Sequence, residues 1–245
     1  MSKTIKKQYL TKKINKIKVD KSIKCNKSNF NAMSKRNISY IVVHYTGNKK
    51  DNAKNNSIYF SGDNCNASAH FFVDDKNIYQ SVKLRDIAWH CGTKGKYYHS
   101  VCRNSNSIGI EMCTSGNYRV SDKTKTNSAY LCAELCKMIG ISAKDIDKYI
   151  LRHYDITHKN CPAQMVKYDD EWKKFKQKVK NILEPKKETK KEAKKENKKD
   201  LNLVAKEVYK GNYGNGQERT KKLKAEGYTS DEIKKIQNLV NELCE

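Results

Sequence analysis

Two histidines and one cysteine in this 245-residue chain have the chemistry and spacing of a metal site. His44 and His153 each follow a short apolar run, and Cys161 lies eight residues after His153. Two imidazoles and one thiolate suit Zn²⁺, and three protein ligands leave a fourth position open for water. The chain has six His and nine Cys, so a buried core histidine and a small buried thiol are the alternative interpretation of the same residues.

Apolar strands must carry these ligands to one place. Residues 38–45 form an apolar, β-branched run around His44, and a last short strand is expected to begin at 150, before His153. Polar ligands at the ends of buried strands would place a metal at the edge of a sheet, where substrate can reach it. Because strands and helices are mixed along the chain, the sequence predicts an α/β fold with a central mixed β-sheet flanked by helices. Further strands are expected at 69–73, 78–82 and 107–113, and helices at 128–139 and 169–183.

The clearest domain boundary is a charged segment at 184–200, in which Lys-Lys-Glu recurs every four residues. This segment has no apolar face to bury, so we interpret it as a Lys/Glu-rich linker. The linker separates a catalytic domain at 1–183 from a small all-α module at 201–245. Residues 1–35 are a basic N-terminal arm, which either packs on the first domain or extends from it as a tail.

The charge of the chain is strongly positive. It has 51 Lys and Arg residues against 27 Asp and Glu, a formal net charge of +24. This charge favours an anionic polymer as partner: nucleic acid, a membrane surface or an anionic cell wall. Homeodomain, zinc-finger and RNA-recognition motifs are absent, so we expect no nucleic-acid partner. No apolar run approaches the ~20 residues of a membrane span, and the basic N-terminus lacks the apolar segment of a signal peptide, so we expect synthesis in the cytosol.

Five short segments carry a resemblance to a known family. In chain order they are VVHYTG at 42–47, SAHFFVD at 68–74, AWHCG at 88–92, NSIGIE at 106–111, and RHYD with a later CP between 152 and 162. Together they resemble the zinc-dependent N-acetylmuramoyl-L-alanine amidases of phage endolysins and bacterial autolysins, which are relatives of the peptidoglycan recognition proteins. The resemblance covers about residues 36–166, and it implies that fold and a zinc-dependent hydrolase of peptidoglycan.

The resemblance implies a role for five residues. His44, His153 and Cys161 match the zinc ligands of the family. Glu111 matches the base that would take a proton from zinc-activated water and pass it to the leaving amine. Lys159 matches a residue that would stabilise the oxyanion. Without the resemblance, Glu111 would be interpreted as a surface carboxylate and Lys159 as one of many solvated lysines.

The sequence departs from the family at Ala69, where some relatives have a catalytic Tyr. This departure puts a tyrosine-based mechanism in doubt and shifts the expected acid–base role to Glu111. For His70 an alternative is a position beneath the site, where the ring packs or orients a ligand. Substrate contacts are predicted for His70, Trp89, His90 and Thr157.

The C-terminal module has a resemblance of its own. The segment VAKEVYKGNYGNGQER at 204–219 is similar to the short cell-wall-binding repeat of some phage lysins. The resemblance implies that the module binds muropeptide. Tyr213 would stack on a sugar ring and Arg219 would pair with a carboxylate, and the alternative is that both residues stabilise the fold of the module.

These expectations describe a two-domain peptidoglycan hydrolase that cleaves the amide bond between N-acetylmuramic acid and L-alanine. Its partner would be bacterial peptidoglycan. As a phage or prophage endolysin it would wait in the host cytoplasm, pass through the pore of a holin, and then act on the cell wall. The alternatives are a non-catalytic peptidoglycan-recognition protein on the same fold, a zinc peptidase that acts on the stem peptide, and a basic nucleic-acid-binding protein.

Overall fold

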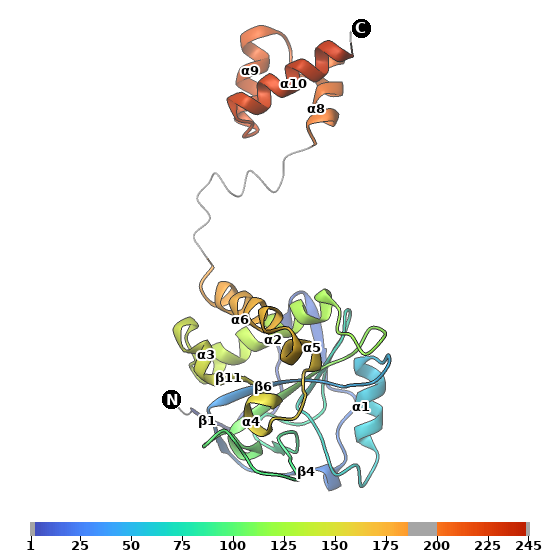
Figure 1. The fold of residues 1–245 in the computed structure, drawn as a ribbon, viewed down its shortest axis with the longest axis vertical. Coiled ribbons are helices and arrows are strands. Elements are labelled where there is room, and N and C mark those ends of the chain that lie inside the picture. The colour runs from blue at the N-terminus through green and yellow to red at the C-terminus, as the bar shows by residue number, and fades with distance from the viewer. Residues whose placement is uncertain (1–2, 186–199, 244–245) are drawn as a thin grey trace. The chain divides into compact units, whose positions relative to one another are not determined.

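The computed structural model describes residues 3–185 and 200–243, and it divides into two compact units, Met1–Pro185 and Lys186–Glu245 (Figure 1). The first unit holds the mixed sheet and the second is helical. The Lys-Lys-Glu repeat that the sequence predicts as a linker falls at 186–199 and lies outside the described residues.

The first unit is built on a mixed sheet, which confirms the predicted fold class. Within the described residues the sheet has seven strands in the order β11-β6-β10-β7-β8-β3-β2. Strands β11, β6, β10 and β7 are parallel neighbours, and β8 runs antiparallel to β7. The strands are β2 (Lys13–Ile14), β3 (Ile17–Asp20), β6 (Tyr40–Tyr45), β7 (Phe71–Val73), β8 (Ile78–Gln80), β10 (Ser107–Met112) and β11 (Ile150–Arg152).

The N-terminal arm packs on this unit. Strand β3 extends the main sheet by pairing with β8, and β1 (Lys3–Ile5) pairs with β5 (Arg36–Ile38) in a separate ribbon. A second two-stranded ribbon joins β4 (Phe30–Asn31) to β9 (Ile87–Ala88). The arm is anchored because four of its apolar side chains, Ile5, Leu10, Ile14 and Val19, are buried in the main hydrophobic cluster.

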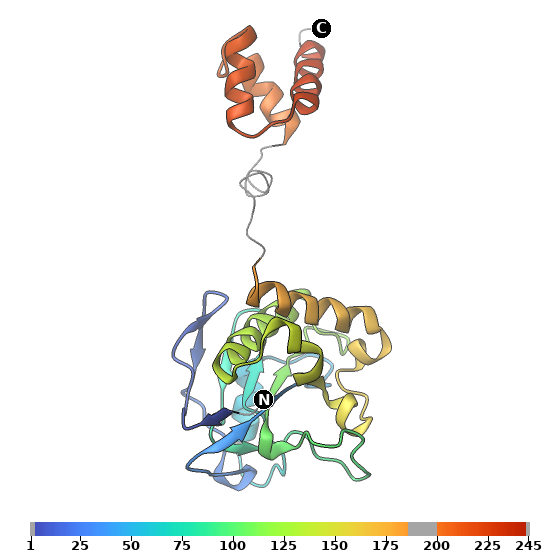
Figure 2. The same ribbon diagram turned by 90° about the vertical axis from the view of Figure 1, so that its left-hand side faces the viewer.

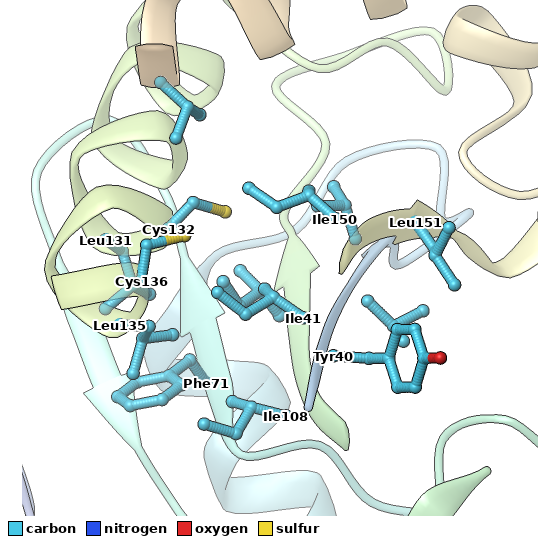
Figure 3. Packing of buried hydrophobic residues seen from close by; sticks show 14 of the residues in the cluster. Tyr40, Ile41, Phe71, Ile108, Leu131, Cys132, Leu135, Cys136, Ile150 and Leu151 are labelled. Atoms are coloured by element: carbon cyan, nitrogen blue, oxygen red, sulfur yellow. The ribbon is translucent and has the colours of Figure 1, made fainter. Parts of the chain in front are cut away.

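Helix α2 (Asp122–Ile139) covers one face of the sheet. Ser121 caps its first turn by accepting a hydrogen bond from the Thr124 amide, and Gly140 ends it with a φ of 82° that favours glycine. Its apolar face packs on the sheet, where Figure 3 shows Leu135 next to Phe71. Helix α6 (Asp169–Leu183) packs against α2, on the same side of the sheet in both ribbon views (Figures 1 and 2).

Four shorter helices complete the first unit. They are α1 (Ala53–Ser61), α3 (Ile146–Tyr149), α4 (His153–Thr157) and α5 (Ala163–Lys167). Helix α4 begins directly where β11 ends, so the chain turns sharply at His153.

The alternation of side chains along the strands separates the core from the chemistry. Successive strand residues point to opposite faces of a sheet. Ile41 and Ile108, which are register partners, point toward α2 (Figure 3). His44 and Glu111 are also register partners and have the opposite parity, so they lie together on the other face. Candidate catalytic groups therefore occupy the face that α2 and α6 leave uncovered.

The second unit is a compact group of helices. Its described helices are α8 (Leu201–Tyr209), α9 (Gly216–Ala225) and α10 (Ser230–Glu242). Val204, Val208, Leu223 and Ile236 are buried together at its centre. Over the described part of the chain, none of the helices has the length and apolar character needed to cross a membrane.

Candidate metal and catalytic site

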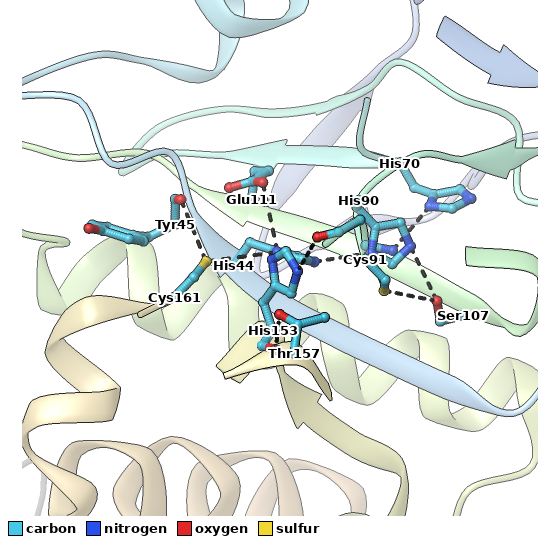
Figure 4. A network of polar contacts seen from close by, with 12 residues as sticks. His44, Tyr45, His70, His90, Cys91, Ser107, Glu111, His153, Thr157 and Cys161 are labelled. Carbon is cyan, nitrogen blue, oxygen red and sulfur yellow. Dashed lines mark hydrogen bonds and ion pairs between the residues drawn. The ribbon is translucent and has the colours of Figure 1, made fainter. Parts of the chain in front are cut away.

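His44, His153 and Cys161 converge on one point, although the first and last are 117 positions apart in the chain (Figure 4). One ligand atom from each residue lies within 4.8 Å of the others. His44 stands near the end of β6, and His153 follows β11, which is the parallel neighbour of β6. The Tyr154 amide donates a hydrogen bond to the Cys161 carbonyl at 3.0 Å and so folds the next loop back toward the two imidazoles.

The ring of His153 is oriented for metal binding. Its Nε2 lies 3.2 Å from the carbonyl oxygen of Gly92, which can only accept, so Nε2 carries the hydrogen. Its Nδ1 is buried and has no hydrogen-bond partner among the described residues. A buried lone pair without a partner is costly, and a metal ion would satisfy it. The donor set itself supports this assignment, because Cys161 Sγ lies 3.8 Å from His44 Nδ1.

Burial sets the protonation of the three residues. It lowers the pKa of His153 to about 4 and the pKa of His44 well below its usual value, so both imidazoles are neutral near pH 7. It raises the pKa of the Cys161 thiol to about 12. A thiolate here would need a cation beside it. Two neutral imidazoles and one cysteine fit a tetrahedral ion such as zinc with one open position.

Glu111 lies next to this cluster. Its Oε1 is 4.0 Å from His44 Nδ1, and its Oε2 is buried without a hydrogen-bond partner in the described structure. Burial raises the pKa of Glu111 to about 8, an effect that the charge of Lys159 reduces and that of Asp51 adds to. A carboxyl group with such a pKa can accept and release a proton near neutral pH.

Lys159 is exposed and follows α4. Its positive charge contributes to lowering the pKa of both His44 and His153, which places it within electrostatic reach of the cluster. The Lys159 amide donates to Thr157 Oγ1 at 3.3 Å, and Thr157 Oγ1 donates to the carbonyl of His153 at 3.4 Å. Thr157 is only 8% exposed, and its two hydrogen bonds stabilise the segment between His153 and Lys159.

Burial argues against the substrate contacts predicted for His70 and His90, whose residues are 0% and 7% exposed. Nδ1 of His70 accepts from the Gly109 amide at 3.0 Å, and its Nε2 faces Arg36. Both imidazoles lie beneath the site and face the protein interior. Trp89 is partly exposed, and its indole Nε1 donates to Asn31 Oδ1 at 2.7 Å.

Two features of the surroundings were not expected as site components. Asp51 accepts a hydrogen bond from the Thr114 amide at 2.7 Å and adds negative charge near Glu111. His158 stacks on the exposed ring of Tyr98, with 3.5 Å between centroids. Asp51 and Tyr98 lie in polar loops, where the sequence has no periodic apolar pattern from which a place near the site could be predicted.

In the second unit, the structure places Tyr213 and Arg219 in internal contacts. Tyr213 is 5% exposed, and its hydroxyl donates to Glu226 at 2.8 Å. Arg219 donates to the Gly214 carbonyl at 3.1 Å and to Gln237 at 2.7 Å. These contacts favour the structural alternative over stacking on sugar or pairing with a carboxylate.

Family models match both units. The model described as N-acetylmuramoyl-L-alanine amidase matches residues 34–164, and the CW_7 repeat model matches residues 202–244. The N-acetylmuramoyl-L-alanine amidase CwlL of Bacillus licheniformis is 36% identical over 152 residues, which cover 58% of this chain and 41% of CwlL. The amidase BlyA of Bacillus subtilis (strain 168) is 37% identical over 150 residues, covering 57% of this chain and 40% of BlyA. The chain thus spans less than half the length of these relatives.

Solved structures resemble the first unit. A mutant endolysin from Bacillus subtilis is 26% identical, with a TM-score of 0.55, and the match covers 66% of this chain and 99% of that one. The structure of PlyL is 27% identical, with a TM-score of 0.54, and the match covers 67% of this chain and 98% of PlyL.

Proposed function

The chain belongs to the N-acetylmuramoyl-L-alanine amidase family, and we propose that it hydrolyses the amide bond between N-acetylmuramic acid and L-alanine in bacterial peptidoglycan. The observation that carries this proposal is the convergence of His44, His153 and Cys161 beside the partly buried carboxyl of Glu111. An amide is a poor electrophile, and this arrangement combines a metal-ligand set with a base on one face of a sheet.

Zinc is the proposed metal, held by His44, His153 and Cys161. Zinc supplies Lewis-acid polarisation of a carbonyl and lowers the pKa of water to about 7. The neutral imidazoles offer their lone pairs, and the Gly92 carbonyl keeps the His153 ring in place.

Glu111 is the proposed general base. The burial that raises its pKa to about 8 makes its ionised carboxylate a stronger base, which suits a group that takes a proton from the attacking water and returns it to the leaving amine. Ala69, which stands where some relatives have a tyrosine, has no proton to give and is buried. The acid–base role therefore rests on Glu111, and Lys159 would stabilise the negative charge that develops on the amide oxygen.

The second unit is the proposed wall-binding module, supported by its match to the CW_7 repeat. Joining a weak binder to the catalytic unit raises the effective concentration of enzyme at the wall. We assign boundaries of 1–183 for the catalytic domain, 184–200 for the linker and 201–245 for the module. We also propose that the protein is an endolysin, which stays in the host cytoplasm until a holin opens a path to the wall; the likeness to a Bacillus subtilis endolysin supports this.

Digestion of purified cell walls tests the function. The protein should release new amino termini, and mass spectrometry of the products should show muramic acid separated from intact stem peptides. Chelation of the metal should abolish the activity and zinc should restore it. A cut inside the stem peptide would favour a peptidase, and wall binding without new amino termini would favour a recognition protein. Full activity after metal removal would overturn the proposed mechanism.

A further inference from the structure

The metal site uses Nδ1 of His44, and its other ring nitrogen has a separate contact. His44 Nε2 lies 3.0 Å from Nδ1 of His90, and both rings are buried (Figure 4). One of these two nitrogens must carry the hydrogen that joins them. If it is His44 Nε2, the His44 lone pair is on Nδ1, where the metal ligands converge. If it is His90 Nδ1, the His44 lone pair points away from the site.

Ser107 decides between the two arrangements. Its hydroxyl has a single hydrogen, which it donates to the carbonyl of Arg103 at 2.7 Å. Ser107 Oγ also lies 3.2 Å from Nε2 of His90, and toward this nitrogen it can only accept. His90 Nε2 therefore carries the hydrogen of the neutral ring, and His90 Nδ1 is an acceptor. Cys91 Sγ lies 3.2 Å from the same Nδ1, and its thiol hydrogen can be donated to an accepting Nδ1.

We propose that Ser107 and His90 form a positioning relay that selects the metal-binding tautomer of His44. Hydrogen bonds run from His44 Nε2 to His90 Nδ1, and from His90 Nε2 to Ser107 Oγ. The lone pair of His44 Nδ1 is thereby directed toward Cys161 Sγ, 3.8 Å away. For His153 the carbonyl of Gly92 achieves the same selection directly. Outer contacts of this kind orient metal ligands and raise their basicity.

Strand β10 is built to hold the relay. Ser107, Gly109 and Glu111 alternate along it and so share one face. A Cβ atom on Gly109 would lie 2.6 Å from Cγ of His90, too close for any real side chain. The His90 ring therefore occupies the space that Gly109 leaves free. The backbone amide of His90 donates a hydrogen bond to Asn104 Oδ1 at 3.0 Å, which holds the residue in place. One strand thus supplies the hydroxyl, the space for the ring, and the proposed base.

Histidine NMR tests the direction of the relay in the full chain. This inference rests on the proposed metal site, but its tautomers can be measured without metal. Long-range ¹H–¹⁵N spectra of the metal-free protein should show the hydrogen on Nε2 for both His44 and His90. A hydrogen on Nδ1 of either ring would overturn the relay. Replacing the hydroxyl by S107A should introduce the Nδ1–H form of His90.

Zinc affinity tests its consequence. Asparagine at position 90 keeps an acceptor near the position of Nδ1, whereas leucine removes it. We expect His90→Leu to weaken zinc binding by about 10–100-fold in competition with a chromophoric chelator, and His90→Asn to restore most of the affinity. Equal zinc affinity for wild type and His90→Leu, with the fold intact by circular dichroism, would overturn the inference. Absence of zinc binding by the wild type would instead reject the metal site.

Discussion

At the scale of single residues, burial changes the pKa of ordinary side chains in the candidate site. Glu111 shares a strand with apolar residues and lacks a hydrogen-bond donor for Oε2 within the described structure, so its carboxyl is more easily protonated than usual. Cys161 shows the same effect on a thiol, whose pKa rises to about 12. Both groups are adapted to the proposed cation at the centre of the site, because each would be costly as an isolated buried charge.

The role of Glu111 can be tested by Glu111→Gln. Glutamine keeps the shape of the side chain but cannot take a proton, so the rate of amide hydrolysis should fall by about 10²–10⁴-fold. Zinc content, measured by elemental analysis, should stay at the wild-type level. Asp170→Asn is a matched control, because this carboxylate is on α6 with its side chain 84% exposed. Activity within a few-fold of wild type would exclude Glu111 as the base.

Cys161→Ser tests the thiolate ligand. A hydroxyl is a poorer zinc ligand than a thiolate. Zinc affinity should therefore fall by more than the loss of about 10–100-fold that is expected when a residue that only contacts a ligand is replaced. Competition with a chelator measures the change. Cys65→Ser serves as control, because that thiol is half-buried and its contacts are to backbone carbonyls near α1. Unchanged affinity in Cys161→Ser would remove the residue from the proposed ligand set.

The sequence located the three residues of the proposed metal site better than it located the residues that contact them. His44 and His153 each follow an apolar run, and that pattern places them at strand ends. His70 and His90 have no such marker. Whether an imidazole faces substrate or lies behind a ligand depends on strand register and on the missing side chain of Gly109, and neither is visible in a local pattern.

At the scale of elements, the strands with continuous apolar runs were predictable and the N-terminal ones were not. Strands β6 and β10 are long enough to show their character. Strands β2 and β3 are joined by Asn15 and Lys16, both with positive φ. This turn lacks the glycine that usually reveals a two-residue hairpin. Their pairing depends on contacts with distant strands, which no short sequence window contains.

Asp75 connects the start of α2 to the turn after β7. Burial alone would raise the pKa of Asp75, but hydrogen bonds from Ser121 and from Thr124 Oγ1, at 2.7 Å for the latter, outweigh it and leave the pKa below its usual value. A carboxylate whose pKa is lower in the folded state than in the unfolded state stabilises the fold at pH values above its unfolded-state pKa. This contribution is lost as the pH falls through the folded-state pKa.

Asp75→Asn should therefore destabilise the protein by about 1 kcal/mol at pH 7. The difference from wild type should shrink below pH 4, as the wild-type carboxyl becomes protonated. Urea unfolding at several pH values, followed by circular dichroism, measures it. The exposed Asp63 provides the control Asp63→Asn. A difference that is constant from pH 7 to pH 3 would show that charge at position 75 is not involved.

At the scale of the whole molecule, two units in one chain divide the proposed work between chemistry and attachment. The internal contacts of Tyr213 and Arg219 favour a role for these two residues in the fold of the module itself. A wall-binding surface must then be sought on other side chains of α8–α10. The sequence predicted that this unit is all-α, but it could not say which aromatic residues point inward.

A variant that ends at Pro185 tests this division. On small soluble muropeptides it should match the full chain, because the proposed catalytic residues all lie in the first unit. On intact walls at low protein concentration it should be slower, by about 10-fold or more, because the tethered binding is lost. Release of amino termini measures both rates. Equal rates on walls would show that the second unit adds nothing to attachment.

The wide separation of the three converging ligands also has a consequence during synthesis. A nascent chain that has emerged only to residue 149 already contains His44 and Glu111 but lacks β11, the loop after it and two of the three donors. Such a chain has only one of the three proposed donors and cannot form the proposed metal site. We therefore expect capture of the proposed metal ion to be a late event in biogenesis, and ribosome-bound chains of increasing length should acquire zinc only after translation has passed position 161.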